Sequence, residues 1–244
     1  METAPVWITG ASSGIGRGLA LKLAREGRKV VVSARSAEAL ADLAREHPNL
    51  AAWPLDTTDA DACAAAIAGI EAAHGKIALA VLNAGTHIPT PAADFRIADA
   101  KRLIDVNLTG TVNALAPLLG RRTRHIAIVA SVAGYSGLPT AAIYGATKAA
   151  LINMCEALKP ECDALGIKLQ LVDPGFVRTP LTDKNEFPMP FLMELDAAVD
   201  AFARGLAADR FEIVFPRRFA LILKFLRLLP YGLYFRLVRR MTGV

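Results

Sequence analysis

Two side chains suited to proton transfer, Tyr144 and Lys148, stand four residues apart in a segment with helical character. At that spacing they share one face of a helix, about a turn apart. An unperturbed tyrosine has a pKa of about 10, too high for a base near neutral pH. A nearby ammonium group favours the phenolate and lowers that pKa. The pair therefore predicts a general acid/base, although a solvated helix pair gives the same pattern by chance.

Further polar residues follow the ends of predicted strands. Ser131 comes directly after the apolar run at 125–130, 13 positions before Tyr144, and Asn107 lies in the predicted helix before that run. Ligands of open parallel sheets bind at the carboxyl ends of the strands, which meet at one edge. We expect that edge to gather Asn83-Ala84-Gly85, Asn107, Ser131, Tyr144 and Asp173-Pro174-Gly175 with Val177, Arg178 and Thr179.

A glycine-rich turn, Thr9 to Gly16, follows the first predicted strand. Glycines let a backbone approach a pyrophosphate closely, and the N-terminus of the next helix supplies free N–H donors and a positive dipole end. The spacing differs from the common G-x-G-x-x-G, and a turn without a ligand is the alternative. Its place in the chain favours dinucleotide binding through Gly10, Ser12, Ser13, Gly14, Ile15 and Gly16.

The end of the second predicted strand bears on which dinucleotide binds. An NAD site places a carboxylate there, about 20 residues beyond the glycines. This chain has Ser33-Ala34-Arg35-Ser36 instead, with no acid before Glu38. The planar Arg35 side chain suits a 2′-phosphate, with Ser33 or Ser36 adding a hydroxyl, although a solvated loop arginine is the alternative. The sequence favours NADP(H), with NAD(H) left as the alternative cofactor.

Strands and helices must alternate to position these residues. Continuous apolar runs predict strands at 6–8, 30–32, 50–55, 77–82, 125–130, 168–172 and 212–215. Helices are predicted between them at 14–26, 37–46, 59–74, 99–119, 140–165 and 197–208. Strands that are apolar throughout are typical of a parallel sheet covered on both faces. The sequence predicts a doubly wound α/β fold of Rossmann type with seven parallel strands.

Composition and charge exclude several classes of protein. The 244 residues are 53% hydrophobic, too apolar for a disordered chain. Three cysteines and four scattered histidines lack metal-ligand spacing, so we expect neither a metal site nor a disulfide framework. The net charge of +5 divides unevenly: residues 216–244 hold seven basic side chains and no carboxylate. We therefore divide the chain into a domain at 1–215 and a basic tail at 216–244.

Taken together, these motifs resemble the short-chain dehydrogenase/reductases over residues 4 to about 215. The matching residues are T-G-x-x-x-G-x-G at 9–16, Asn83-Ala84-Gly85, Asn107, Ser131, Tyr144-x-x-x-Lys148 and Pro174-Gly175. One basic position used by NADP-preferring members is Ser13 here, so only Arg35, helped by Arg17, supports NADP. Family members are usually dimers or tetramers, which implies a homodimer or homotetramer.

The resemblance implies a role for each matching residue. Tyr144 would exchange a proton with the substrate oxygen, and Ser131 would hydrogen-bond that oxygen. Lys148 would lower the pKa of Tyr144 and bind the nicotinamide ribose. Asn107 would position a water in a proton relay from Lys148. The remaining cofactor contacts would come from Asp56 and Thr57 at the adenine, Asn83, Ala84 and Gly85 along the adenosine, and Pro174, Gly175, Val177 and Thr179 near the carboxamide.

An apolar segment occupies the position of the family's substrate lid. It contains Phe187, Pro188, Met189, Pro190, Phe191, Leu192 and Met193. A Met-rich apolar lid suits a hydrophobic alcohol or ketone better than a sugar or phosphate ester. The alternative is that these residues merely pack the lid onto the body.

The basic tail reads as an amphipathic pair of helices. Arg217, Lys224 and Arg227 share one face, with Phe219, Ile222, Leu223 and Leu226 opposite, and Arg236, Arg239 and Arg240 follow Pro230. Such a segment favours contact with an anionic membrane surface through 217–240. Packing on the body or on a second subunit is the alternative. We expect no nucleic-acid binding, because no recognised motif accompanies the charge.

The first residues carry no secretory signal, since Met1-Glu2-Thr3 lacks a positive n-region. We expect a cytoplasmic protein, peripheral on the membrane if the tail binds lipid. The expected function is an NAD(P)(H)-dependent oxidoreductase interconverting a secondary alcohol and a ketone on a small hydrophobic substrate. A dinucleotide-binding regulatory or scaffold protein without turnover is the alternative.

Overall fold

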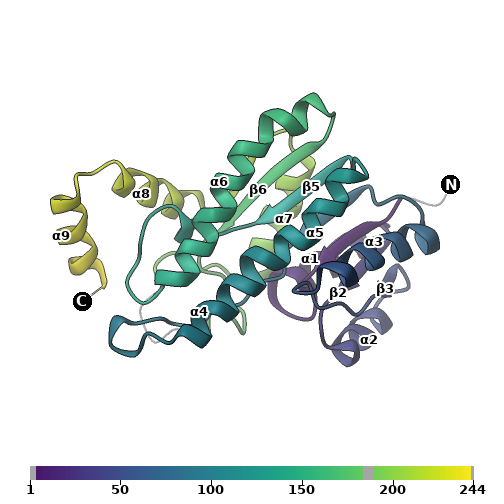
Figure 1. Cartoon of the computed structure of the whole chain (residues 1–244), viewed down its shortest axis with the longest axis horizontal. Coiled ribbons are helices and arrows are strands. Elements are labelled where there is room, and N and C mark those ends of the chain that lie inside the picture. The colour runs from purple at the N-terminus through teal and green to yellow at the C-terminus, as the bar shows by residue number, and fades with distance from the viewer. Residues whose placement is uncertain (1–3, 184–188, 243–244) are drawn as a thin grey trace.

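The computed structural model describes residues 4–183 and 189–242, and these form one parallel sheet with helices on both faces (Figure 1). The strands are β1 (Val6–Thr9), β2 (Val30–Ser33), β3 (Leu50–Ala52), β4 (Leu79–Leu82), β5 (His125–Val129), β6 (Lys168–Pro174) and β7 (Glu212–Phe215). Their order in the sheet is β3-β2-β1-β4-β5-β6-β7, and every pair is parallel. The predicted seven-stranded doubly wound fold is confirmed.

Helices cover the sheet in two layers. Residues of α1 (Gly14–Arg25), α2 (Ala37–Arg45) and α7 (Leu195–Ala207) form one hydrophobic core with one face of the sheet. Residues of α3 (Ala60–His74), α5 (Gly110–Gly120) and α6 (Ala142–Ala164) form the core on the other face. Strands β1, β2 and β4 are buried at every position, which explains why they are apolar throughout.

Two predicted elements differ from the observed ones. The third strand ends at Ala52 rather than Leu55: Trp53 and Leu55 still donate to Val32 and Ala34, but Pro54 between them has no N–H for the ladder. The predicted helix at 99–119 is three segments, namely α4 (Ile97–Ile104), a π-helical turn η2 (Asp105–Thr109) and α5. Two short 3₁₀ turns complete the body, η1 (Ala92–Asp94) and η3 (Val132–Gly134).

The basic tail folds as two helices beyond β7, α8 (Arg217–Arg227) and α9 (Tyr231–Thr242), at the yellow end of Figure 1. Phe219, Leu223 and Leu226 are buried and belong to the same core as α3, α5 and α6. These three residues therefore pack on the body, which is the alternative to the membrane contact that the sequence favoured for this apolar face. Ile222 was placed on that face as well, but it is 39% exposed.

Candidate active site

Tyr144 and Lys148 lie on the first turns of α6, as their spacing predicts. Lys148 is buried, and its Nζ donates to the Val129 carbonyl at 3.0 Å, at the end of β5. That Nζ lies 5.7 Å from the centroid of the Tyr144 ring. The helix thus holds a phenol and an ammonium group beside each other at the carboxyl end of the central strands.

Ser131 lies two residues beyond β5 and caps the η3 turn. Its hydroxyl accepts from the Ala133 amide at 3.2 Å and donates to the Pro174 carbonyl at 3.2 Å. Gly134 lets this turn approach α6, because a Cβ there would lie 2.7 Å from the Lys148 backbone. Direct backbone packing therefore fixes Ser131 relative to the α6 residues.

The protonation of Tyr144 depends on this packing. Burial raises the pKa of Tyr144 above its ordinary value, and the charge of Asp173 raises it further. The hydrogen bond with Ser131 lowers that pKa. Burial also lowers the pKa of Lys148 to about 8, while Asp173 acts in the opposite direction. Ser131 therefore acts on the phenol of Tyr144 against the effects of burial and of Asp173.

Asn107 lies fully buried in the π-helical turn between α4 and α5. Its Oδ1 accepts from the Thr86 amide at 2.7 Å, and its Nδ2 donates to the Thr86 carbonyl at 3.0 Å and to Thr147 Oγ1 at 3.2 Å. A Cβ on Gly85 would lie 3.4 Å from Asn107 Oδ1 and 3.5 Å from Lys148 Nζ. The side chains of Asn107 and Lys148 therefore lie close together at Gly85. One lone pair of Asn107 Oδ1 accepts no hydrogen bond from the described residues.

Sequence reasoning missed one aromatic neighbour of Tyr144. The His87 ring meets the Tyr144 ring edge to face, with centroids 4.8 Å apart, and His87 is buried. The only signal in the sequence is its place two residues after Gly85. His87 therefore packs directly against the phenol ring of Tyr144.

The glycine turn is held together by hydrogen bonds from the end of β4. Thr9 Oγ1 accepts from the amides of Asn83 and Ala84, at 3.0 and 3.1 Å. Asn83 Nδ2 donates to the carbonyls of Thr9 and Gly10, both at 3.1 Å. Gly10 has a φ of +66°, and a Cβ there would lie 2.7 Å from Ala84 Cα. The turn therefore requires glycine at this position.

The N-terminus of α1 faces this turn without a side-chain cap. Ser13 is at the N-cap position, but its hydroxyl makes no capping hydrogen bond. Ser12 and Ile15 are half-buried around it. First-turn N–H groups with no side-chain acceptor, beside a turn with little room for side chains, fit a phosphate group. The residues of the turn therefore fit a dinucleotide pyrophosphate.

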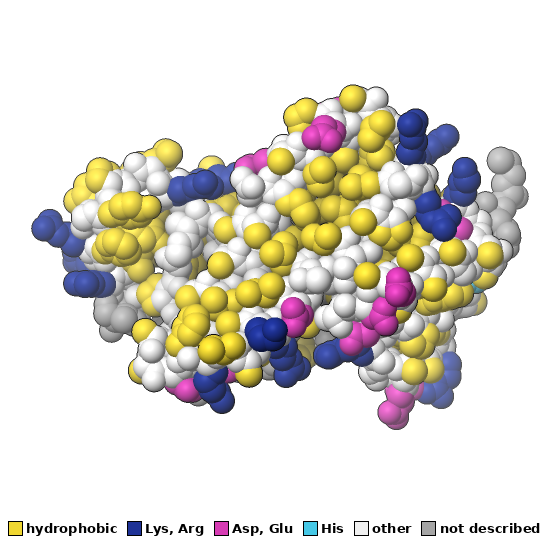
Figure 2. Space-filling view, in the orientation of Figure 1, with side chains coloured by type: hydrophobic (Ala, Val, Ile, Leu, Met, Phe, Trp, Pro, Cys, Tyr) yellow, Lys and Arg dark blue, Asp and Glu magenta, His cyan; other side chains and the backbone are white. Residues whose placement is uncertain are grey.

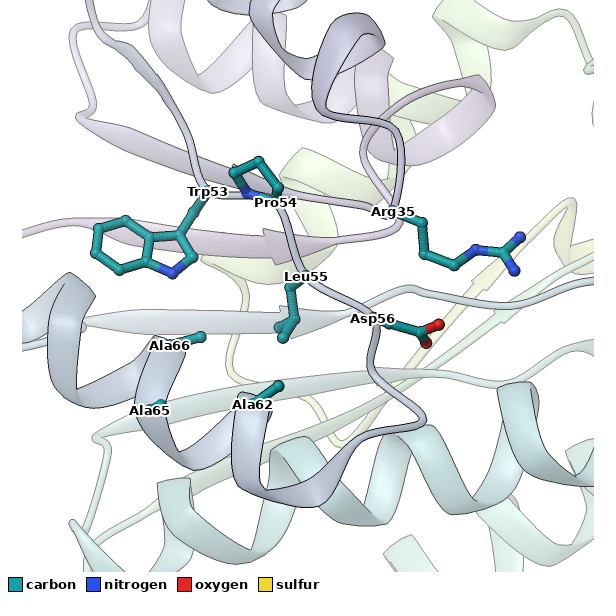
Figure 3. Close-up of a pocket in the computed structure, with 8 residues that line it drawn as sticks. All are labelled: Arg35, Trp53, Pro54, Leu55, Asp56, Ala62, Ala65 and Ala66. Atoms are coloured by element: carbon teal, nitrogen blue, oxygen red, sulfur yellow. The ribbon is translucent and has the colours of Figure 1, made fainter.

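Arg35 and Asp56 line an open hollow of about 650 Å³ together with Trp53, Pro54, Leu55 and three alanines of α3. Their side chains extend to the same side from the segments after β2 and β3 (Figure 3). The Thr58 amide lowers the pKa of Asp56 below its ordinary value, and the charge of Arg35 adds to this. The predicted adenine and 2′-phosphate residues thus lie together.

Three predicted helpers of Arg35 have other partners. Ser33 is buried, and its hydroxyl accepts from the Trp7 indole at 2.9 Å. Ser36 caps α2 by accepting from the Ala39 amide at 3.2 Å. Arg17 pairs with Glu46. Among these four side chains, Arg35 is the one whose polar group has no protein hydrogen bond or ion pair in the described part of the chain.

The segment after β6 joins the two ends of the site. Val177 forms an isolated bridge with Met193. The Thr179 amide donates to Thr182 Oγ1 at 3.1 Å. Thr179 Cγ2 would lie 3.3 Å from a Cβ built on Gly14. The segment that follows Pro174 and Gly175 thereby comes next to the start of α1 at Thr179.

Thr57 is buried, as its place under α5 requires. Its carbonyl accepts from Asn113 Nδ2 at 3.0 Å, and its Oγ1 would lie 2.8 Å from a Cβ on Gly110. Asn113, which sequence reasoning missed, holds the segment that carries Asp56 and Thr57 against α5.

The predicted lid is described in part. Phe187 and Pro188 lie outside the described residues. Phe191 is 46% exposed and stacks on Phe219 of α8 with centroids 5.8 Å apart. Phe219 also stacks on Phe176 at 5.5 Å. The tail and the lid therefore share one aromatic cluster.

The whole site matches a known family model. The model of the short chain dehydrogenases matches residues 4–188. The chain belongs to the short-chain dehydrogenase family. It is an oxidoreductase of the class that acts on CH–OH and C=O groups, and the resemblance inferred from its motifs is confirmed.

Relatives of this short-chain dehydrogenase include an uncharacterized oxidoreductase of Myxococcus xanthus, 38% identical over 243 residues and 96% of each chain. Two solved structures show the same fold. A short-chain dehydrogenase/reductase of Burkholderia phymatum is 23% identical with a TM-score of 0.82, covering 91% of this chain and 92% of its own. ElxO is 24% identical with a TM-score of 0.76, covering 87% and 97%.

Metal and thiol chemistry find no support in the described residues. Over 4–183 and 189–242, no three His, Cys, Asp or Glu side chains gather as a metal site would require. The cysteines are buried and free, and burial raises the pKa of the Cys63 thiol to about 11. No described helix has the length and apolar character needed to cross a membrane.

Proposed function

We propose that this short-chain dehydrogenase interconverts a secondary alcohol and a ketone on a small hydrophobic substrate, with NADP(H) preferred over NAD(H). The observation that best supports this proposal is that four polar residues lie together at the carboxyl ends of the strands. They are Ser131, Tyr144, Lys148 and Asn107. A dinucleotide-binding scaffold has no need of a buried ammonium group beside a phenol.

Tyr144 is the proposed proton donor and acceptor for the substrate oxygen. Ser131 supports this role, because its hydrogen bond favours the phenolate against the cost of burial. Lys148, with a pKa of about 8, exchanges protons near neutral pH and passes them toward Asn107. A bound nicotinamide would supply or accept the hydride. The protein residues would orient the substrate and move the proton.

The proposed cofactor preference depends on Arg35. Its guanidinium is exposed at the adenine end, with Asp56 on the same side and Glu38 as the next carboxylate along the chain. The ElxO structure contains NADP and the Burkholderia phymatum structure contains NAD, so this fold accommodates both. Gly10, Gly14 and Gly16 would hold the pyrophosphate, and Thr179 with Val177 would approach the carboxamide.

Replacing the phenol of Tyr144 tests the proposed reaction. Tyr144→Phe keeps the ring and its packing against His87 but removes the proton. We expect turnover to fall at least about 10³-fold, while the dissociation constant for NADPH changes less than about threefold. Fluorescence titration measures the binding and nicotinamide absorbance the turnover. Undiminished turnover would reject Tyr144 as the acid/base; a wild-type chain that binds NADPH without reducing any ketone would favour the scaffold.

The substrate class is proposed from the apolar character of the lid and of the loop after Ser131. Phe191 of the lid and Leu138 of the loop after Ser131 are apolar and incompletely buried. A panel of aliphatic, aromatic and sugar ketones, assayed with both cofactors, tests this. We expect kcat/KM to rise with the apolar area of the ketone, by about tenfold per 55 Å². A preference for sugars would contradict the proposal.

We also propose that the outer surface of α8 and α9 contacts anionic lipid, as a peripheral site on a cytoplasmic enzyme. Figure 2 shows hydrophobic and basic side chains side by side over these helices. Leu221, Phe225 and Leu228 are 62–80% exposed, with Tyr231 and Phe235 beyond them. Arg217, Arg218, Arg227, Arg236, Arg239 and Arg240 surround them without a carboxylate in the tail. Lys224 differs from the other basic residues of the predicted face, because it pairs with Glu212 while its side chain stays 43% exposed.

Charge neutralisation tests the lipid contact better than truncation, because truncation would remove buried Leu223, Leu226 and Val238 from the core. In an Arg236→Gln, Arg239→Gln, Arg240→Gln variant we expect vesicle binding to fall about 100-fold, given about 1 kcal/mol per basic group. Vesicles with and without phosphatidylserine measure it. Sedimentation of the free protein tests the alternative, a homodimer or homotetramer buried on this surface. The lipid proposal would be overturned if the wild-type protein does not bind phosphatidylserine vesicles and instead self-associates through the surface of α8 and α9.

A further inference from the structure

A chain of polar side chains connects helix α8 to the end of β6. Lys224 Nζ donates to both carboxylate oxygens of Glu212, at 2.6 and 2.5 Å. Glu212 Oε1 lies 2.8 Å from the Tyr135 hydroxyl, and that hydroxyl lies 3.1 Å from Asp173 Oδ2. Lys224 also lies 5.1 Å from the Tyr135 ring centroid. The tail therefore reaches the sheet edge through four consecutive polar groups.

Asp173 is the buried end of this chain. It is fully buried, and its Oδ1 has no hydrogen-bond partner among the described residues. The phenol of Tyr135 has one proton, so it can donate to Asp173 or to Glu212 but not to both. Two carboxylates thus share one phenol proton and one cation. Such an arrangement is retained at a cost in stability and calls for a role.

The same chain is bonded to the candidate active site. Tyr135 directly follows the η3 turn that Ser131 begins, and Asp173 directly precedes Pro174, whose carbonyl accepts from Ser131. The Tyr135–Asp173 and Ser131–Pro174 hydrogen bonds therefore tie the same two segments together at both ends. The charge of Asp173 also acts on both Tyr144 and Lys148.

We propose that the Lys224–Glu212–Tyr135–Asp173 chain positions Ser131 and controls the charge of Asp173 near Tyr144 and Lys148. Lys224 of the tail then acts on the reaction from outside the site. This inference depends on the proposed function, because it assigns a positioning role toward the proposed acid/base. Lys224 and Tyr135 are positioning residues and touch no reacting atom. Helix α8 then belongs to the working enzyme, whatever its outer surface binds.

The expected pH dependence follows from the charges around Asp173. Burial is the largest influence on Asp173, and it raises the pKa of that carboxyl to about 7, with Glu212 adding to it. Tyr135 and Lys224 act in the opposite direction. Ionised Asp173 raises the pKa of Tyr144. Titratable or charged groups reach Asp173 from several neighbouring elements. They are Tyr135 after the η3 turn, Glu212 on β7, Lys224 on α8, and Tyr144, Lys148 and Cys155 on α6.

Neutral Asp173 should therefore make the Tyr144 phenolate easier to form. In Asp173→Asn the pH at which kcat for alcohol oxidation reaches half its maximum should fall by at least about 0.5 units. Lys224→Met should shift it in the same direction by less, because Asp173 then holds its proton to higher pH. Lys224→Arg should restore the wild-type profile. Arg25→Met, which removes an exposed cation of α1, is the charge-matched control.

Ultraviolet titration of tyrosine ionisation, with Tyr144→Phe as the blank, reports the same shift without turnover. Circular dichroism confirms that each variant is folded. Wild-type profiles in both folded Asp173→Asn and Lys224→Met would overturn the proposal. A shifted Tyr144 titration in a chain without dehydrogenase activity would support the electrostatic coupling and reject the proposed function instead.

Discussion

The two ends of the sheet edge are built in opposite ways. At the nucleotide end, after β1 to β3, a glycine turn lies beside the exposed side chains of Arg35 and Asp56. The hydroxyls of this end interact with Trp7, Ala39 and the Asn83 amide. At the catalytic end, after β4 to β6, Asn107, Ser131 and Lys148 are buried side chains held by one to three hydrogen bonds each. Cofactor binding at the nucleotide end should therefore depend on the space beside the backbone, and proton transfer at the catalytic end on the charges around Tyr144.

This difference separates the kinds of substitution that each end should tolerate. A polar side chain can change at the nucleotide end with modest effect, provided that the backbone keeps its path. At the catalytic end, a single hydroxyl or charge changes the protonation of Tyr144. Substitutions at each end therefore sharpen or break the comparison.

Among the substitutions that contrast the two ends, removal of the Ser131 hydroxyl should have the largest effect. Ser131→Ala deletes the hydrogen bond that lowers the pKa of Tyr144 and one proposed donor to the substrate oxygen. We expect kcat to fall about 10²- to 10³-fold with cofactor affinity nearly unchanged. Steady-state kinetics and NADPH titration of the same variant measure both. A variant that loses cofactor affinity but keeps kcat would reverse the assignment of the two ends.

Adding one methyl group at the nucleotide end should act through space. In Gly16→Ala the new Cβ would lie 2.5 Å from the Gly10 carbonyl oxygen and from Asn83 Nδ2. We expect NADPH affinity to fall about 10- to 100-fold, corresponding to about 1–3 kcal/mol of overpacking. Gly120→Ala is the matched control, because nothing lies within 4 Å of its Cβ. Equal NADPH affinities in the two variants would show that the glycine turn can accommodate a methyl group at Gly16.

Arg35→Ala should change cofactor choice and little else. Loss of the guanidinium removes the proposed partner of the 2′-phosphate, so KM for NADPH should rise about tenfold or more. KM for NADH should stay within about twofold. Parallel kinetics with the two cofactors check this. If both values rise together, Arg35 serves the nucleotide in general rather than its phosphate.

The smallest expected effect concerns stability at the catalytic end. The folded-state pKa of Asp173, about 7, lies above its ordinary value of 3.8, so the native chain binds the extra proton between these pH values. Stability from this group is therefore present below about pH 4 and is lost as the pH rises toward 7. Asp173→Asn should raise the melting temperature more at pH 8 than at pH 5. Calorimetry at both pH values measures this, and an equal change at both would contradict the assigned pKa.

Sequence patterns predicted the fold well because strand burial is local information. The runs at Val30–Val32 and Ile126–Ala130 are apolar throughout, which is typical of a sheet covered on both faces. The meeting of Asn107, Ser131, Tyr144 and Lys148 followed from strand ends sharing one edge. Their mechanistic roles stay predictions.

Features that depend on three-dimensional partners were not predictable in this way. The π-helical turn at Asn107 appears in the sequence as ordinary helix. The ion pair of Lys224 depends on Glu212, which lies twelve residues earlier in β7. The contact of His87 with Tyr144 and the pairing of Ser33 with Trp7 join residues far apart in sequence, and no spacing rule reports them.

The last two helices also bear on how the enzyme is made. Phe219, Leu223 and Tyr234 fill the same core as α3, α5 and α6, and the Tyr234 hydroxyl donates to the Gly137 carbonyl in the loop between Ser131 and Tyr144. A nascent chain whose α8 and α9 are still inside the ribosome lacks these groups. The catalytic half can therefore close only after α8 and α9 have been synthesised, whereas the glycine turn and its β1 and β4 supports emerge much earlier.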